Sequence, residues 1–284
     1  MRFIRYAHNG AEGLAVRTED GARGFLTTDA GYPGSLFSLI NEGRAALDAA
    51  GAALASGNPV DLDKIDYLPP ITEAEKNIAV GLNYSAHTAE GPHEQPDYPT
   101  LFARFASSFV GHGAPMLRPR QSEKFDYEGE LVAVIGKTAK NVSRAEALDY
   151  VAGYSLFNDG SIRDYQRRTP QWTPGKNFDG TGAFGPEFIT ADELPAGCKG
   201  LTLTTRLNGQ EVQKAPIDDM VFPIDELVEI ISAVMTLKPG DVIITGTPSG
   251  VGHARKPPLW MKPGDTVEVE VDQVGILTNP IKDA

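Results

Sequence analysis

The 284-residue sequence contains a single cysteine, Cys198, and few basic residues for its size. One cysteine excludes an intramolecular disulfide framework and any zinc site that needs several cysteines. The 26 lysines and arginines are outnumbered by 38 aspartates and glutamates, so the formal net charge is −12. Nucleic acids and anionic membranes repel a protein of this sign, and we expect neither as a partner.

Long apolar stretches are also missing. No run approaches the roughly 20 apolar residues that a membrane-spanning helix needs. The first six residues alternate between polar and apolar and lack the apolar segment of a secretory signal. We therefore expect a globular protein of the cytoplasm.

Glycine and proline, in contrast, are plentiful. The 30 glycines and 21 prolines follow no fixed period, which excludes a collagen-like repeat and favours a β-rich fold with many tight turns. The apolar fraction of 41% is enough for a sizeable core and argues against intrinsic disorder.

Residues 1–70 differ in pattern from the rest and predict a small N-terminal α/β domain. Alternating segments at 2–6 and 14–18 indicate strands, and apolar residues at helical spacing predict a helix over 35–57. A proline-rich joint then leads into the main domain, residues 71–284.

The main domain offers six short strand candidates and two helices. Helices are predicted over 143–151, which starts with a capping-box spacing, and over 224–236, which carries an amphipathic stripe. Strands without regular helix alternation favour a mostly β (α+β) fold, a sandwich or a coiled sheet, over a doubly wound fold. The predicted strands are 77–81, 130–136, 154–158, 201–207, 241–245 and 266–271.

The strongest chemical signal is a pair of glutamates, Glu128 and Glu130, that runs directly into the apolar segment 131–135. Residues two apart in a strand share a face and lie about 7 Å apart along the chain. Two anions beside a core repel each other unless a cation lies between them, and oxygen ligands suit a hard ion, Mg²⁺ first, with Mn²⁺ or Ca²⁺ as alternatives. A strand start with both carboxylates in water is the other interpretation.

A second acidic segment supplies a third candidate ligand. Asp159 follows the apolar strand 154–158, and a helix is predicted from Ser161 onward, on which Arg163 and Gln166 share a face. Asp159 could instead serve only as a cap or turn residue. Three carboxylates with waters would form a Mg²⁺ site that leaves room for a chelating substrate.

A candidate general base comes from His87, because Glu90 lies three residues later and can orient the imidazole on a short helix. The polar, proline-rich segment 91–99 that follows predicts a lid over a bound ligand. The remaining histidines are expected to be structural or exposed: His8, His93, His112 and His253.

Two further residues have weaker signals. Lys176, in a glycine-rich loop, could stabilise a developing enolate, although a surface lysine is the commoner interpretation. Thr247 lies in a glycine-rich segment, 246–252, that could present backbone amides and a hydroxyl to an anion.

Taken in order, five stretches of residues 71–284 resemble the fumarylacetoacetate hydrolase superfamily. They are Gly-Leu-Asn-Tyr-x-x-His-x-x-Glu at 81–90, Asp-Tyr-Glu-Gly-Glu-Leu at 126–131, Asn-Asp-Gly-Ser-x-Arg-Asp-x-Gln at 158–166, Gly-Lys-x-Phe-Asp at 175–179, and the segment 237–252 around Thr-Gly-Thr-Pro. The resemblance implies a mixed β-sandwich roll as catalytic domain, a small N-terminal domain and a homodimer.

The resemblance also implies a set of roles. Glu128, Glu130 and Asp159 become ligands of Mg²⁺ or Mn²⁺. The implied catalytic residues are the water-activating pair His87 and Glu90, together with Lys176, and the implied substrate contacts are Arg163, Gln166 and Thr247.

The function predicted from these roles is metal-dependent hydrolysis of a carbon–carbon bond in a small keto acid, an acylpyruvate or related 2,4-diketo acid, through a stabilised enolate. Three other activities could use the same enolate: a hydratase, a decarboxylase of an oxaloacetate-like acid, and an isomerase. A binder of small diacids without catalytic activity is the alternative from a different functional class.

Overall fold

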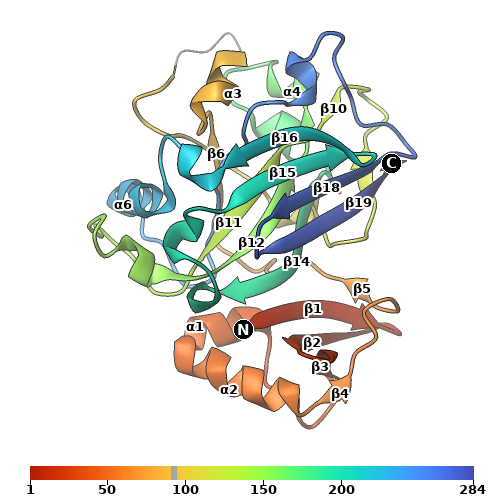
Figure 1. Ribbon diagram of the computed structural model, residues 1–284, viewed down its shortest axis with the longest axis vertical. Helices are drawn as coiled ribbons and strands as arrows, with labels where there is room; N and C mark the ends of the chain where they lie inside the picture. Colours follow the sequence, from red (N-terminus) through yellow and green to blue (C-terminus); the bar gives the residue numbers. More distant parts are fainter. Residues whose placement is uncertain (91–94) are drawn as a thin grey trace.

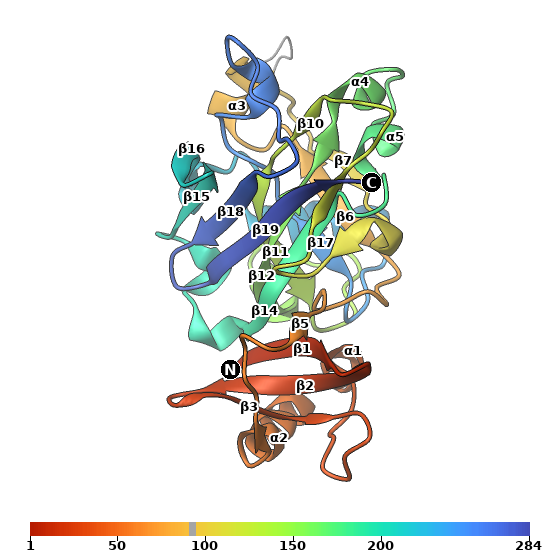
Figure 2. The ribbon, with the colours of Figure 1, turned by 90° about the vertical axis from the view of Figure 1, so that its right-hand side faces the viewer.

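The computed structural model describes residues 1–90 and 95–284. The central element is a large mixed sheet of twelve strands, which runs through both the N-terminal part and the main part of the chain (Figures 1 and 2). Its strands, in spatial order, are β4 (Asn58–Pro59), β3 (Gly21–Leu26), β2 (Ala11–Thr18), β1 (Arg2–His8), β14 (Gly182–Thr190), β12 (Val151–Asp159), β11 (Gly129–Ile135), β17 (Val242–Ile244), β6 (Asn77–Gly81) and β7 (Thr100–Ala103), while β5 (Asp66–Tyr67) pairs with β1 and β8 (Phe109–Val110) with β14.

A second sheet packs on one face of the first. Its strands, in spatial order, are β16 (Gln210–Pro216), β15 (Thr202–Leu207), β18 (Thr266–Val271), β19 (Gly275–Asp283) and β9 (Met116–Arg118). A short ladder joins β10 (Phe125–Asp126) to β13 (Ser161–Ile162). These sheets confirm the predicted mostly β fold.

The helices are short. They are α1 (Leu36–Glu42), α2 (Arg44–Ala55), α3 (Ser85–Glu90), α4 (Arg163–Gln166), α5 (Thr173–Lys176) and α6 (Ile224–Val234). Within the described residues, none is long and apolar enough to cross a membrane.

Strand β11 shows why the core has two layers. Leu131 and Ala133 join the cluster beneath the second sheet, whereas Val132 and Val134 join the cluster that includes the core of α1 and α2. Alternate residues of a strand face opposite sides, so a strand that is buried on both faces needs apolar residues at consecutive positions. This explains the uninterrupted apolar sequence 131–135 of β11.

The N-terminal strands and helices α1 and α2 lie at one end of the molecule, drawn in red and orange in Figures 1 and 2. Strand β1 pairs antiparallel with β14, so the large sheet continues from one part into the other. The division of the chain into domains 1–70 and 71–284 stays a prediction.

Several sequence-based boundaries were wrong. The single helix predicted over 35–57 is two helices, because Gly43, at φ 98°, ends α1. In place of the helix predicted over 143–151 there is a 3₁₀ turn, η2 (Ala147–Tyr150), and Val151 already begins β12. There the Ser143 and Glu146 side chains bond each other at 2.6 Å instead of capping backbone N–H groups.

The predicted helix after Ser161 is limited to α4, since residues 161–162 pair as β13. Strands β14, β16 and β19 had not been predicted. Strand β14 contains Gly185 and Pro186, and because both residue types are uncommon inside strands, its sequence did not indicate a strand. The predicted lid over 91–99 includes residues 91–94, which lie outside the described residues.

Candidate metal centre and active site

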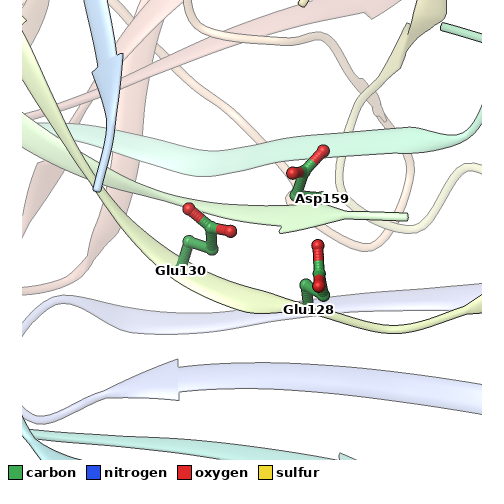
Figure 3. A group of neighbouring side chains, drawn as sticks. All are labelled: Glu128, Glu130 and Asp159. Atoms are coloured by element: carbon green, nitrogen blue, oxygen red, sulfur yellow. The ribbon is translucent and has the colours of Figure 1, made fainter. Parts of the chain in front are cut away.

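Three carboxylates meet at the end of the β11–β12 pair (Figure 3). Glu130 lies in β11, Asp159 is the last residue of β12, and Glu128 lies in the link between β10 and β11. Each offers one oxygen atom, and these atoms all lie within 4.8 Å of one another. Glu128 is outside the strand, so the expected strand geometry of the pair was wrong in detail, but the two side chains still converge.

The pairing of β11 with β12 explains why Asp159 joins the glutamates. Glu130 lies opposite Phe157, and Gly129 lies opposite Asn158. The Asp159 N–H then donates to the Glu128 carbonyl at 2.8 Å. The ladder therefore places the last residue of β12 beside Glu130 of β11 and beside Glu128, which directly precedes β11, although about thirty residues separate them.

The three carboxylates differ in their electrostatic surroundings. Burial, and then the neighbouring Asp159 and Glu128, raise the pKa of Glu130 well above its usual range. Burial also acts on Glu128, but Arg163 and Lys176 outweigh it and lower the pKa of this carboxyl. Glu130 is therefore the carboxyl of the three whose negative charge its surroundings most disfavour.

Lys176 lies between two of the carboxylates. Its Nζ is 2.6 Å from Asp159 Oδ2 and also donates to Glu128. The side chain is 2% exposed, so the interpretation as a surface lysine was wrong. Gly175 makes this burial possible, because a Cβ there would lie 2.3 Å from the backbone nitrogen of Gln166 and would push α5 away from α4.

Arg104, which the sequence had not identified, lies behind Asp159. Its Nη1 is 3.0 Å from Asp159 Oδ1, and both side chains are 0% exposed. Among the described residues, no donor reaches Asp159 Oδ1 with hydrogen-bond geometry. Within that part of the chain, Asp159 Oδ1 has an ion-pair partner but no hydrogen bond, and such an oxygen beside two glutamates suits a hard divalent cation.

Arg163 holds the next layer of the site together. Its Nη2 and Nη1 donate to Glu128 Oε1 at 2.7 Å and to Gln166 Oε1 at 2.9 Å. Its Nε donates to Asp126 Oδ2 at 2.7 Å. The guanidinium therefore orients both a candidate metal ligand and the candidate substrate contact Gln166.

Helix α3 carries the candidate base. His87 Nδ1 lies 3.6 Å from Glu90 Oε2, just beyond hydrogen-bond distance. Glu90 accepts the Gly250 N–H with both oxygens at 2.9 Å, so this backbone amide orients the carboxylate. A small movement of the imidazole would bring it into contact with Glu90.

Thr247 uses its hydroxyl within the protein. The Oγ1 donates to the Gly129 carbonyl at 2.9 Å and accepts from Gln213 Nε2 at 2.8 Å. Its one proton is therefore committed, and the hydroxyl fixes the start of β11 against the segment after β17.

A single cavity of about 620 Å³ brings the candidates together. His253, which was expected to be structural or exposed, also lines this cavity. All nine candidate residues from the sequence line this cavity: His87, Glu90, Glu128, Glu130, Asp159, Arg163, Gln166, Lys176 and Thr247.

Comparisons with known proteins agree with this architecture. Residues 76–282 match the family model "Fumarylacetoacetate (FAA) hydrolase C-terminal". A mitochondrial oxaloacetate tautomerase of Xenopus laevis, fahd2, is 40% identical over 288 residues, which cover 99% of this chain and 90% of the relative.

Two solved structures show the same fold. A fumarylacetoacetate hydrolase from Exiguobacterium antarcticum superposes with a TM-score of 0.85 at 32% identity, covering 100% of both chains. A 5-carboxymethyl-2-hydroxymuconate delta-isomerase from Mycobacterium smegmatis gives 0.78 at 33%, covering 100% of this chain and 99% of the other. The family match spans most of the chain and includes the three-carboxylate cluster, and this chain therefore belongs to the fumarylacetoacetate hydrolase family.

Proposed function

We propose that this protein is a divalent-metal-dependent enzyme that interconverts the keto and enol forms of a small 2-oxo dicarboxylic acid, with oxaloacetate as its substrate. The observation that carries the proposal is the convergence of three buried carboxylates, Lys176 and a histidine–glutamate pair on one cavity. The relative named an oxaloacetate tautomerase, which aligns over 99% of this chain, supports the choice of substrate.

Glu128, Glu130 and Asp159 would hold the ion, and the all-oxygen ligand set favours Mg²⁺ or Mn²⁺. When bound, such an ion supplies Lewis acidity that lowers the free energy of an enolate. Arg104 fixes Asp159 from behind, and Arg163 fixes Glu128. The ligands are thus oriented before any substrate enters, so little reorganisation is needed during the reaction.

His87 is the residue that moves the carbon proton in this proposal. Keto–enol interconversion breaks a C–H bond next to the oxo group, and an imidazole with a carboxylate beside it is a suitable base. Glu90 orients the imidazole, and the Gly250 amide orients Glu90. Lys176 adds positive charge where the enolate oxygen develops.

Hydrolysis of a carbon–carbon bond in an acylpyruvate is the second candidate. The same His87–Glu90 pair could deprotonate a water molecule, and the family includes the structurally similar Exiguobacterium hydrolase. Both reactions need the enolate, but hydrolysis also needs a water placed at the distal carbonyl. Tautomerisation does not require this positioned water. The X. laevis tautomerase is also more similar to this chain in sequence than the Exiguobacterium hydrolase, at 40% against 32% identity.

Three assays with Mg²⁺, each with and without EDTA, separate the candidates. A tautomerase accelerates loss of the oxaloacetate enol without releasing pyruvate. A decarboxylase releases pyruvate from oxaloacetate, and an acylpyruvase releases pyruvate from acetylpyruvate. Acetylpyruvate cleavage without tautomerisation would favour the second candidate, and turnover that EDTA leaves unchanged would contradict the metal-dependent scheme altogether.

The setting of the enzyme is also proposed. We infer that it acts as a homodimer, from the family resemblance, and in the cytoplasm, from the sequence. Size-exclusion chromatography with light scattering tests the first proposal, and fractionation of the source cells tests the second.

A further inference from the structure

His253 lies in the 3₁₀ turn η6 (Gly252–Ala254). It is far from His87 in the sequence, but both residues line the same cavity. Its ring Nδ1 is 3.2 Å from Asp126 Oδ2, and its side chain is 15% exposed. Helix α3 and the blue segment that contains η6 lie at the same end of the molecule (Figure 1). The cavity therefore has two histidines, each with a carboxylate beside it.

Asp126 is built to remain a carboxylate acceptor. It is completely buried and receives the N–H groups of Gly252 and His253, at 2.7 and 3.0 Å, and Nε of Arg163 at 2.7 Å. An ionised carboxylate can only accept hydrogen bonds, so Nδ1 of the imidazole must carry a hydrogen and donate it to Asp126. In the neutral form of the ring, this contact places the proton on Nδ1 and leaves the lone pair on Nε2.

The Nε2 atom of His253 is the reactive end of this arrangement. Within residues 1–90 and 95–284, the only side-chain hydrogen bond of the ring is the one at Nδ1. A ring that lines a cavity and has its other nitrogen fixed by a carboxylate can accept or return a proton at Nε2.

The backbone holds η6 tightly against Asp126. A Cβ at Gly252 would lie 2.6 Å from Asp126 Oδ1 and 1.9 Å from the Leu259 carbonyl oxygen, so only glycine allows this approach. Two residues earlier, the Gly250 amide holds Glu90 of α3. One short segment, 250–253, thus positions both histidine–carboxylate pairs.

We propose that His253 is a second acid–base residue of the reaction, which exchanges the proton of the enol oxygen while His87 exchanges the proton of the neighbouring carbon. The proposal rests on the proposed tautomerase function. In the enol-to-keto direction the O–H bond breaks, its proton passes to Nε2 of His253, and its electron pair forms the C=O bond. The enol π pair forms the new C–H bond with a proton from His87, and no oxidant or reductant is needed.

The test uses the full-length protein with saturating Mg²⁺ and oxaloacetate. His253→Gln and His253→Ala should lower kcat for tautomerisation by about 10²- to 10⁴-fold, the usual range for loss of an acid–base group. Both should keep the Mg²⁺-induced rise in Tm, because His253 is not a candidate ligand. Added imidazole should restore part of the activity of His253→Ala, which a structural role would not allow. His8→Gln changes a half-buried histidine of β1 that does not line the cavity, so it is the matched control and should keep wild-type activity.

The outcomes are distinct. If wild-type protein with Mg²⁺ fails to accelerate tautomerisation, the proposed function and the role of His253 both fall. If the wild type is active and the His253 variants match it, the role of His253 alone is overturned. A loss of activity that imidazole does not restore, accompanied by a loss of the Mg²⁺-induced Tm rise, would show that the ring is structural and would also overturn the proposal.

Discussion

The guanidinium of Arg104 lies 3.0 Å from the carboxylate of Asp159, and neither side chain has any exposed surface. A buried ion pair is costly to break from one side, because the remaining charge then has no partner. Arg104→Met should lower the free energy of unfolding of the metal-free protein by about 3 kcal/mol, measured by urea denaturation. Arg104→Lys keeps the charge and should lose less. Equal stability of wild type and Arg104→Met would show that the pair contributes nothing net.

Added metal should stabilise the wild-type protein. A ligand at 100 times its Kd adds about 2.7 kcal/mol to the free energy of unfolding, which thermal denaturation with and without Mg²⁺ detects as a higher Tm. Glu130→Gln removes one candidate ligand and should weaken Mg²⁺ binding at least tenfold, about 1.4 kcal/mol.

The same variant should be more stable than wild type without metal, since it removes the charge that its neighbours disfavour. Glu12→Gln changes an exposed glutamate in β2 and serves as the control. A Glu130→Gln protein with the full Mg²⁺ response would contradict the proposed ligand set.

The stability of the metal-free protein should depend on pH through Glu130. Burial, and then Asp159 and Glu128, raise the pKa of this carboxyl in the folded state. Its contribution to stability is therefore complete below the unfolded pKa of about 4.3 and is lost as the pH rises through the folded pKa. Metal binding needs the deprotonated form, so the Tm gained from Mg²⁺ should grow with pH. Melting curves from pH 5 to 8 test this, and a gain that does not change with pH would contradict it.

Cys198 should be inert in the folded protein. Burial raises the pKa of this thiol to about 12, so almost no thiolate exists at neutral pH. Ellman's reagent at pH 8 should therefore react with the unfolded chain in urea and not with the native one. The neutral thiol contributes stability that is complete below the unfolded pKa of about 8.5 and is lost as the pH rises toward 12. Rapid labelling of native protein would contradict the burial.

The sequence could predict the parts of the site that depend on local pattern. Glu128 and Glu130 lie beside an uninterrupted apolar strand, and His87 and Glu90 have helical spacing, so each pair was visible within ten residues. Asp159 could be suspected as a residue at a strand end. Its place beside the glutamates, however, depends on the register of β11 with β12, which the sequence does not specify.

Arg104 and His253 could not be predicted in the same way. His253 meets Asp126 across 127 positions of the chain, and Arg104 reaches the end of β12 from the far edge of the large sheet. No periodicity links such pairs, since they meet only after the strands have paired. The burial of Lys176 was missed for the same reason, because it depends on the close approach of α5 to α4.

His87 should be needed for catalysis and not for metal binding. It lines the cavity beside Glu90 but is not part of the three-carboxylate cluster. His87→Ala should reduce kcat with oxaloacetate by about 10²- to 10⁴-fold and leave the Mg²⁺-induced rise in Tm unchanged. Glu90→Gln keeps the shape of the side chain but removes the charge that orients the imidazole of His87. The base itself remains, so kcat should fall less than in His87→Ala. An active wild type matched by His87→Ala would exclude this histidine as the base, and the carbon proton would then have to be transferred by another group that lines the cavity.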